Sequence, residues 1–531
     1  MAAPEGPKPL FRKRRASGAP CEGRVSRIVL LRLPRIAHTM TDGLPRYVGL
    51  GSFAVLFLAV LTIPLANRAT VCADDFVWIT NAWSGGSLTE ALSIAWASNF
   101  FFRPIDILAN RLINPHSLDV APLLVVQIAG LLALTVGMWR LLALVGSAGA
   151  TSRFVATAWL WLHPATQLSV WSAGCSSQTW CAAFGVWIIC RALELPAERI
   201  GWRHLASLAL LSAGGIIAKE LFVGWATAAA FVIAVGQPGF SGAQNLLPAF
   251  RNRILASCGV ILPPCVWIGS RLWFTRFGDV VHDTSGDLYA LHGPAIVLIN
   301  LGTSLLGMFV QGPVHWARLL GLPWMLVPFV GAALSGAFAF TGGTRAAGTI
   351  ARLPDRLVLP MAVMLGVVAV WPALLIGKVS ELYLMGPNAL IAALVGMGVP
   401  ARRGPSAPGV TVAASALFVI ALAGFVSRSY HFAVTWSQAQ DLRDQVRRVA
   451  EAAAPGSRLV IGVPKALRSG PMHSKYCVPP AVAAGLPQSW FVKRLVDPSL
   501  PEADFLTPIA GGEAAGYTYM LEAPSRSRVM W

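Results

Sequence analysis

The chain has 531 residues, of which 55% are hydrophobic and only 12% are charged, with a mean hydropathy of +0.61. Proteins of average composition carry about 25% charged residues, so this composition excludes an ordinary soluble domain and indicates a polytopic membrane protein. The formal net charge of +18 does not indicate nucleic-acid binding, because the basic residues lie mostly between apolar spans, as the positive-inside rule requires.

Residues 1–46 precede the first apolar span and hold ten Lys or Arg, including the run Arg12-Lys13-Arg14-Arg15. They lack the cleavage pattern of a signal peptide. We expect a disordered, basic cytoplasmic tail and assign it no function. Met40 is an alternative start of the chain.

Eleven apolar spans follow, each long enough or nearly long enough to cross a bilayer as a helix. They cover residues 47–67, 120–139, 154–172, 178–191, 204–218, 221–236, 254–274, 319–340, 357–377, 383–399 and 409–426. The sequence therefore predicts an all-α polytopic membrane protein with about eleven transmembrane helices, and a transmembrane domain over residues 47–426.

Basic loops fix the orientation of these spans, because Lys and Arg are enriched on the cytoplasmic side. The basic residues at 199–203 and 251–253 both belong there, so Lys219-Glu220 between them marks an outer hairpin tip. The basic loop at 345–356 is cytoplasmic only if segment 294–311 does not cross, and we expect that segment to lie in the outer interface. The N-terminus is then cytoplasmic and the C-terminus extracytoplasmic.

Most acidic residues outside the tails fall on the outer face under this topology, and we expect the chemistry there, with a catalytic outer loop at 68–119. These acids are Asp74, Asp75, Glu90, Asp106, Asp119, Glu220, Asp279, Asp283, Asp287 and Glu381. The acids of 279–287, with His282 and His292, match no metal-binding spacing, and a solvated loop is the favoured interpretation.

Four outer elements carry the residues of interest. Asp74 and Asp75 follow the first span, where a carboxylate stays ionised in interfacial water while contacting a lipid-borne substrate. The others are Phe101-Phe102-Arg103-Pro104-Ile105-Asp106, His163-Pro164 and Ala218-Lys219-Glu220. Each has a structural alternative: a helix cap for the acids, a snorkelling arginine, a helix kink at His-Pro, and solvated charge at a hairpin tip.

The order of these elements resembles the GT-C class of integral-membrane glycosyltransferases, which use polyprenyl-phosphate sugars. Within that class it is most similar to the protein O-mannosyltransferases and the lipid A aminoarabinose transferases. The matching stretches are Ala73-Asp74-Asp75-Phe76, Phe102-Arg103-Pro104, His163-Pro164 with Trp171, Ala218-Lys219-Glu220 and Tyr383-Leu384-Met385-Gly386-Pro387. The resemblance spans about residues 47–426.

The chain departs from these relatives after His163-Pro164. They usually carry a Glu and then Gly-Arg-x-Asp, whereas this sequence has Gln167 and then Gly174-Cys175-Ser176-Ser177. The missing Arg and Asp remove a second charged contact near the sugar or phosphate. The tetratricopeptide repeats of some relatives are also missing.

The resemblance implies a role for each residue. Family precedent makes Asp74 the base that takes a proton from the acceptor hydroxyl, while Asp75 holds the loop, caps the following helix or contacts the sugar. Arg103 has a planar fork that fits phosphate oxygens, and Lys219 adds a point charge. Other substrate-site candidates are His163, Trp171, Glu220, Lys378 and Tyr383.

Because a lipid phosphate is already an anionic leaving group, the scheme requires no general acid, metal or other cofactor, although a divalent metal is conceivable. The partners expected are a polyprenyl-phosphate-linked sugar, an extracytoplasmic glycan, lipid or protein acceptor, and membrane lipids. Direct displacement by the acceptor predicts inversion at the anomeric carbon.

Residues 427–531 differ in kind from the rest. Leu442, Val446, Val449 and Ala453 repeat at helical spacing before Pro455-Gly456, and 458–463 and 517–521 are typical of short strands. We expect a small extracytoplasmic α/β domain.

The favoured function is therefore a membrane glycosyltransferase, and the richness in Ala, Gly, Arg and Pro favours a bacterial inner membrane. A lipid-linked glycan transporter or flippase is one alternative, but repeated halves and charges near the membrane midplane are missing. A GT-C scaffold that has lost catalysis is the other. The sugar and the acceptor class stay open.

Overall fold

The structure, a computed structural model, describes most of the chain. The described residues are 43–72, 75–98, 102–145, 149–196, 200–235, 246–281, 292–310, 322–347, 358–375, 381–399, 407–454, 456–468, 479–507 and 519–524. Of the candidate site residues, Asp74 and Lys378 lie outside these ranges, as do His282, Asp283 and Asp287. The chain divides into two units, 1–45 and 46–531, and the fold below is that of the second unit.

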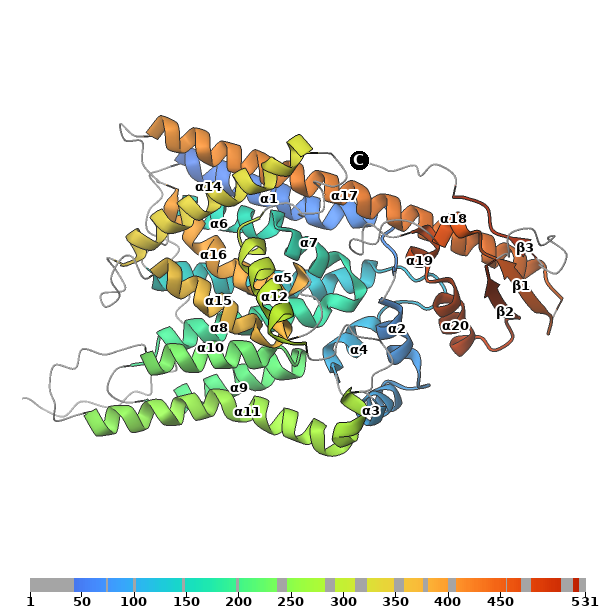
Figure 1. Ribbon diagram of the computed structural model, residues 1–531, viewed down its shortest axis with the longest axis horizontal. Helices are drawn as coiled ribbons and strands as arrows, with labels where there is room; N and C mark the ends of the chain where they lie inside the picture. Colours follow the sequence, from blue (N-terminus) through green and yellow to red (C-terminus); the bar gives the residue numbers. More distant parts are fainter. Residues whose placement is uncertain are drawn as a thin grey trace, which may run out of the picture. The chain divides into compact units, whose positions relative to one another are not determined.

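Long helices form the body of this unit (Figure 1). They are α1 (Gly43–Ala66), α5 (Ala121–Leu144), α6 (Ala150–Leu162), α7 (Pro164–Trp171), α8 (Ser176–Leu193), α9 (Trp202–Ala218), α10 (Phe222–Val235), α11 (Leu246–Val281), α12 (Pro294–Gly307), α14 (Leu322–Ala347), α15 (Val358–Leu374), α16 (Met385–Gly398) and α17 (Ala407–Ala452). Every one of the eleven predicted apolar spans therefore coincides with a helix or, in one case, with two.

That exception is the span predicted over 154–172, which is broken at His163. Pro164 has no N–H to continue the hydrogen-bond ladder of α6, so α6 ends at Leu162 and His163 takes an extended conformation with φ −68° and ψ 141°. Pro164 then occupies the first turn of α7, and His163 Nδ1 accepts a hydrogen bond from Ala165 N at 3.2 Å. The His-Pro pair is thus a helix break and a cap.

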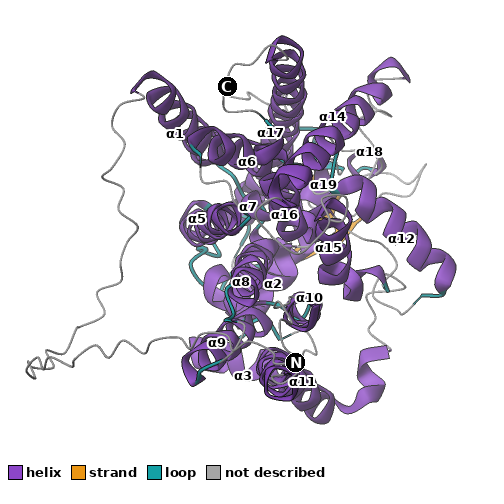
Figure 2. Cartoon of the chain, turned by 90° about the vertical axis from the view of Figure 1, so that its left-hand side faces the viewer, coloured by secondary structure: helices purple, strands orange, loops and turns teal. Residues whose placement is uncertain are grey.

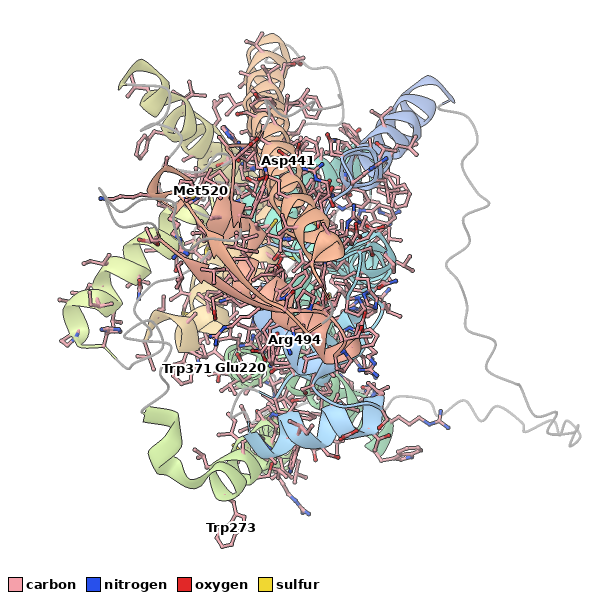
Figure 3. All side chains as sticks on the ribbon, turned by 90° about the vertical axis from the view of Figure 1, so that its right-hand side faces the viewer. Glu220, Trp273, Trp371, Asp441, Arg494 and Met520 are labelled. Carbon is pink, nitrogen blue, oxygen red and sulfur yellow. The ribbon has the colours of Figure 1, made fainter. Side chains whose placement is uncertain are left out.

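Length and apolar composition allow three described segments to cross a bilayer: Ala121–Leu144, Arg251–Trp273 and Gly409–Ala452. Other apolar helices are shorter. Large apolar side chains also point outward, among them Val125 (72% exposed) and Trp273 (82% exposed; Figure 3). Exposed apolar side chains on apolar helices favour a lipid environment over water.

Helix α16 lies in the centre of the bundle, and every one of its residues is buried. It packs against α6, α14 and α15, which surround it in the end-on view of Figure 2. Its neighbours α5 and α8 also pack against each other. Helix α16 is apolar all round and enclosed by its neighbours along its whole length, so it forms the core of the bundle.

Small helices lie between α1 and α5, in the loop 68–119 that is predicted to lie outside and is called the outer loop. They are α2 (Asp75–Trp83), α3 (Leu88–Ser98) and α4 (Pro104–Asn110). The loop is closed at its base, where Thr70 and Asp119 form an antiparallel bridge and Val71 N donates to Leu118 O at 3.2 Å. A short helical turn, η1 (Ala173–Cys175), meets this loop from the start of α8, and a second, η4 (Glu381–Leu384), precedes α16.

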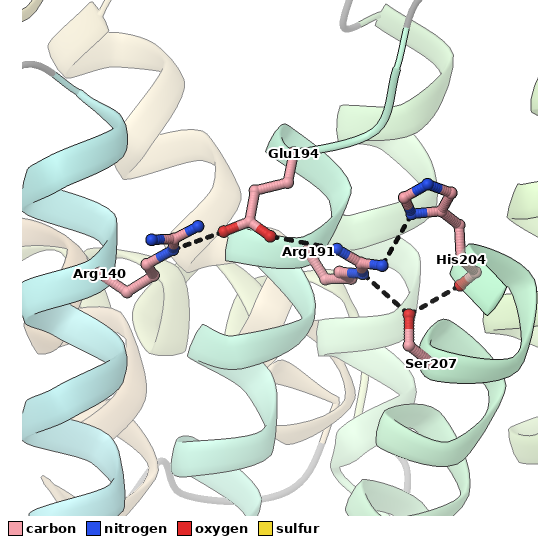
Figure 4. Close-up of polar contacts among 5 residues, drawn as sticks. All are labelled: Arg140, Arg191, Glu194, His204 and Ser207. Carbon is pink, nitrogen blue, oxygen red and sulfur yellow. Dashed lines mark hydrogen bonds and ion pairs between the residues drawn. The ribbon is translucent and has the colours of Figure 1, made fainter. Parts of the chain in front are cut away.

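A polar cluster lies at the opposite ends of α5, α8 and α9 (Figure 4). Glu194 accepts from Arg140 Nε at 2.6 Å and from Arg191 Nη1 at 3.3 Å, and Arg191 also contacts His204 and donates to Ser207. The 17 residues of α9 span about 26 Å at the helical rise, close to the thickness of a hydrocarbon core.

The C-terminal part of the chain differs from its predicted division in two ways. Helix α17 runs without a break from Ala407 to Ala452, so the domain boundary expected at residue 427 falls inside one helix (Figure 1). Two strands were expected, and the described residues of this region form three: β1 (Arg458–Gly462), β2 (Glu502–Leu506) and β3 (Tyr519–Met520).

The three strands form a parallel sheet of order β2-β1-β3, with Leu459 opposite Ala503 and Ile461 opposite Tyr519. Because parallel neighbours need a crossover, the helices α18 (Lys465–Arg468), α19 (Pro480–Ala484) and α20 (Leu486–Val496) lie between β1 and β2 in the chain. Helix α19 packs on α17, and α20 packs on α2 of the outer loop.

Candidate active site at the outer loop

Asp75 connects the outer loop to η1. Its carboxylate is buried (3% exposed) and accepts hydrogen bonds from Ser172 Oγ at 2.7 Å, Gly174 N at 2.8 Å and Ala173 N at 3.2 Å. Asp75 is also the first residue of α2, where a negative charge is favourable. With these donors in place, Asp75 fixes the position of the acid-bearing segment rather than presenting a free carboxylate.

Gly174 is the residue that permits this close approach. A Cβ atom at this position would lie 2.6 Å from the Trp78 ring and 2.9 Å from Asp75 Oδ1. Any larger residue would therefore displace either the indole or the carboxylate. Close packing therefore explains the glycine at the start of the Gly174-Cys175-Ser176-Ser177 stretch.

Arg103 and Glu220 form an ion pair between the outer loop and the turn that joins α9 to α10, with Arg103 buried and Glu220 partly buried. Arg103 Nε donates to Glu220 Oε2 at 2.8 Å, and Nη2 donates to Oε1. The guanidinium also lies over the Trp78 ring, 4.6 Å from its centroid. The planar fork that we expected to bind a phosphate is thus engaged by a carboxylate, 117 residues away in the chain.

Lys219 lies in the same turn, as the hairpin prediction requires, but it is buried instead of solvated (3% exposed). Its ammonium lies 5.3 Å from the centroid of the Tyr383 ring. Among the residues that the structure describes, no carboxylate lies within ion-pair distance of Lys219 Nζ. Lys219 is therefore a buried cation held by an aromatic face.

Asp106 is a fourth charged group of this cluster and is fully buried. Its Oδ1 accepts from Ser177 N at 2.7 Å, which caps the first turn of α8. Its Oδ2 has no hydrogen-bond partner among the described residues. The sequence placed Asp106 on the outer face but gave it no role. Its spacing of three residues from Arg103 could have predicted that both residues belong to one cluster.

Burial and neighbouring charges shift these groups in different directions. Burial raises the pKa of Asp106 despite the opposing effect of Arg103 and Lys219, and burial together with Arg103 lowers the pKa of Lys219. For Glu220, burial raises the pKa, but the Arg103 charge and hydrogen bonds outweigh it and the net shift is downward. For Arg103, burial lowers the pKa, and Glu220 more than reverses this.

The groups of the cluster are not all paired. Arg103 and Glu220 form an ion pair, whereas Lys219 and Asp106 make no ion pair with any described residue. Lys219 therefore places an amine without an ion-pair partner, among the described residues, in a buried and partly aromatic environment. A cation at such a position is stabilised by an anion that joins it, which makes the cluster a candidate anion site.

Two predicted substrate contacts lie in the packed interior. His163 is 1% exposed, and besides capping α7 its Nε2 lies 3.1 Å from Gly307 O. Trp171 is 2% exposed, donates from Nε1 to Val60 O at 3.0 Å and packs against Phe425 and Trp436. Their contacts are those of packing and capping residues, which is the structural alternative noted for His-Pro.

Comparison with known proteins gives distant structural likenesses, among them the following two. No protein-family model matches the chain, and no curated protein matches it. ArnT from Cupriavidus metallidurans, solved bound to undecaprenyl phosphate, has a TM-score of 0.44 and 11% identity, over 85% of this chain and 90% of that one.

The second is the oligosaccharyltransferase AglB from Archaeoglobus fulgidus, solved with an inhibitory peptide and a dolichol-phosphate. It has a TM-score of 0.39 and 11% identity over 79% of this chain and 62% of AglB. Likenesses at these TM-scores establish neither the fold family nor the activity of this chain.

Proposed function

We propose that the protein is a membrane glycosyltransferase that moves a sugar from a polyprenyl-phosphate carrier to an acceptor hydroxyl on the extracytoplasmic side. The observation that carries the proposal is the buried Lys219, a cation with an aromatic neighbour and no carboxylate partner among the described residues, beside the outer loop. A lipid phosphate supplies the missing negative charge, and the apolar helices around it accommodate the polyprenyl chain.

In this proposal Lys219 binds the phosphate, and the Arg103–Glu220 pair positions the outer loop above it. The phosphate oxygen gains charge as the bond to the anomeric carbon breaks, and a fixed cation stabilises that charge most strongly where water is excluded. This assignment moves the phosphate contact from Arg103, the first choice from the sequence, to Lys219.

Asp74 is the proposed base. It is adjacent in the chain to Asp75, whose carboxylate accepts hydrogen bonds from Ser172 Oγ and Gly174 N. It takes the proton from the acceptor hydroxyl as that oxygen attacks the anomeric carbon. The sugar is transferred with inversion, and the polyprenyl phosphate leaves as a dianion. No step of this scheme uses a metal ion.

The proposed setting is a bacterial inner membrane with the N-terminus in the cytoplasm. Residues 1–46 form the cytoplasmic tail, and the region after α17 lies outside, where it helps to select the acceptor. The loop 68–119 and the turn at Lys219-Glu220 then share the outer face with the acceptor.

The experiment that tests the function compares a deletion strain with the same strain restored by the wild type or by Asp74→Asn at equal expression. Mass spectrometry measures extracytoplasmic glycans and lipid-linked sugars. We expect one sugar modification to disappear in the deletion and in Asp74→Asn, with accumulation of its lipid-phosphate donor, because an amide cannot accept the proton.

A matched control is Asp441→Asn, a carboxylate on α17 outside the proposed site (Figure 3). It is expected to restore the glycan fully. If Asp74→Asn also restores it fully, Asp74 is not the base. If the deletion changes no glycan or lipid-linked sugar, the transferase proposal is wrong.

A further inference from the structure

Arg443, on the C-terminal half of α17, is a buried charge without a carboxylate in its hydrogen-bond shell. It is 6% exposed, and the described acceptors of its guanidinium are all uncharged. Nε donates to Ala484 O at 2.9 Å, Nη1 to Thr70 Oγ1 at 2.8 Å, and Nη2 to Val71 O and Ala483 O. Burying a charge is costly, and these hydrogen bonds offset part of that cost.

These acceptors belong to two different parts of the chain. Thr70 and Val71 immediately precede the Cys72-Ala73-Asp74-Asp75 segment, whereas Ala483 and Ala484 are the last residues of α19. One side chain of α17 therefore joins the entrance of the outer loop to the C-terminal helices. The fork of an arginine makes this possible, since lysine has a single donor centre.

The contacts of Arg443 extend through Thr70 to Leu118, at the C-terminal end of the outer loop. Thr70 Oγ1 accepts from Arg443 and donates to Leu118 O at 2.9 Å, and one turn of α17 earlier Gln440 Nε2 donates to Arg68 O. Arg68 and Leu118 have φ of +47° and +55°, in the left-handed region. Residues with a Cβ persist there only where the surroundings hold them. Here Gln440 of α17 contacts Arg68 directly, and Arg443 of α17 reaches Leu118 through Thr70.

The segment after the acids is held from the same side. Phe76 follows Asp75, and its ring lies 5.1 Å from the Arg443 guanidinium carbon. Gly485, between α19 and α20, lies so close that a Cβ there would be 2.4 Å from the Phe76 ring. Val71 and Phe76, which bracket the acids, are thus both fixed by the C-terminal part of the chain.

We propose that Arg443 is a positioning residue for the acid-bearing segment, and that the C-terminal part of the chain sets the geometry of the site through it. The kinetic part of this inference rests on the proposed transferase function, and the positional part does not. Arg443 acts through Val71 and Thr70 and touches no reacting atom in the scheme.

The test uses the full-length protein in lipid nanodiscs, with Arg443→Met and Arg443→Lys. The matched control is Arg447→Met, which removes an exposed arginine (55% exposed side chain) one turn further along the same helix. Thr70→Val is a second, milder variant that removes one acceptor of Arg443, and it tests the inference if Arg443→Met does not fold.

The first readout is amide hydrogen exchange at Val71 and Val120, whose N–H groups close the base of the loop on Leu118 O and Ala69 O. We expect exchange to quicken at least about tenfold in Arg443→Met, and less in Thr70→Val and Arg443→Lys, because buried hydrogen bonds are lost. Amides of α5 and α8, and all amides of Arg447→Met, keep wild-type rates.

The second readout is sugar transfer from the polyprenyl-phosphate donor identified by the strain comparison. We expect kcat to fall about tenfold or more in Arg443→Met with KM for the donor unchanged, because misplaced groups slow the chemical step. We expect Arg443→Lys to retain more of the wild-type kcat than Arg443→Met does. A general loss of folding would instead reduce the active fraction and quicken exchange throughout.

Unchanged exchange at Val71 and Val120 in both Arg443→Met and Thr70→Val overturns the positional inference, whatever the kinetics. Faster exchange with wild-type kcat shows that the segment tolerates movement and overturns the catalytic part. If the wild type transfers no sugar, the proposed function fails, and the exchange rates alone decide whether Arg443 fixes the segment.

Discussion

At the level of single residues, the candidate site is defined by which charges are paired. All four of Arg103, Lys219, Glu220 and Tyr383 were site candidates from the sequence, and the structure brings Arg103 beside Glu220 and Lys219 beside Tyr383. Their roles in binding or catalysis stay predictions. Which cation would be engaged was not predictable, because the partner of Arg103 lies 117 residues away and only the fold brings it close.

Replacement of Lys219 separates the anion site from the ion pair. Lys219→Met keeps an unbranched side chain of similar length and removes the charge, so we expect binding of polyprenyl phosphate to weaken at least about tenfold while the fold is kept. Isothermal titration with a short-chain polyprenyl phosphate in detergent measures this. Arg140→Met, at the opposite end of the bundle, is the matched control and keeps wild-type affinity. Equal affinity of Lys219→Met and wild type would exclude Lys219 as the phosphate contact.

The Arg103–Glu220 pair is expected to stabilise the fold in a pH-dependent way. Glu220→Gln leaves Arg103 buried without its partner and lowers the free energy of unfolding by about 3 kcal/mol at neutral pH. Because the pKa of Glu220 is lower when folded, this stabilisation is fully present above the ordinary glutamate pKa and is lost as the pH falls through the folded-state value.

Thermal unfolding of purified protein between neutral and acidic pH measures the effect. The difference between the wild type and Glu220→Gln should shrink on acidification. Glu502→Gln, which removes an exposed ion pair with Arg494, is the control and should change stability little at any pH. A constant difference across the pH range would show that the Glu220 charge is not what stabilises the protein.

At the level of elements, the length of the apolar spans predicted the helices reliably. The secondary structure of the polar segments was predicted less well. The eleven spans all coincide with helices, because in an apolar environment the backbone N–H and C=O groups must form hydrogen bonds within the segment. The continuity of α17 and the strand β2 were missed, since the former crosses from an apolar to a polar sequence and Glu502–Leu506 has no alternating pattern. Arg443 lies on the same helix face as the buried Ala439, Val446 and Ala450. The helical periodicity of the sequence could therefore have predicted that Arg443 is buried.

The turn between α19 and α20 offers a test of how closely the C-terminal helices pack on the outer loop. Gly485 has φ +51° and lies against Phe76, whereas Gly456 has φ +74° with open space around its Cβ position. Both Gly485→Ala and Gly456→Ala place alanine in the left-handed region, at a cost of about 1 kcal/mol each.

Only Gly485→Ala adds a steric conflict with the Phe76 ring, and we expect it to lower stability by about 1–3 kcal/mol more than Gly456→Ala does. Chemical denaturation of the two variants in the same detergent gives the difference directly. Equal losses would mean that the turn moves away from α2 without cost, and that the two regions are packed less tightly than the contact implies.

At the level of the whole molecule, two clusters of charged groups among the described residues lie at the two ends of α9. The cluster of Arg103, Asp106 and Lys219 lies where α9 ends, and that of Arg140, Arg191 and Glu194 lies beside its start, about 26 Å away along the helix. This separation fits a bilayer between them, but it does not say which end faces the cytoplasm. The basic loops of the sequence favour the second end.

Cysteine labelling tests that orientation. In a variant without the eight native cysteines, Arg140→Cys (51% exposed side chain) and Arg458→Cys (68% exposed side chain) report on the two sides. Treatment of cells whose outer membrane is permeabilised, with a maleimide that cannot cross the inner membrane, should label Arg458→Cys and not Arg140→Cys. Disruption of the inner membrane should make both reactive. The reverse pattern would place the outer-loop acids in the cytoplasm, away from any extracytoplasmic acceptor, and the proposed direction of transfer would be wrong.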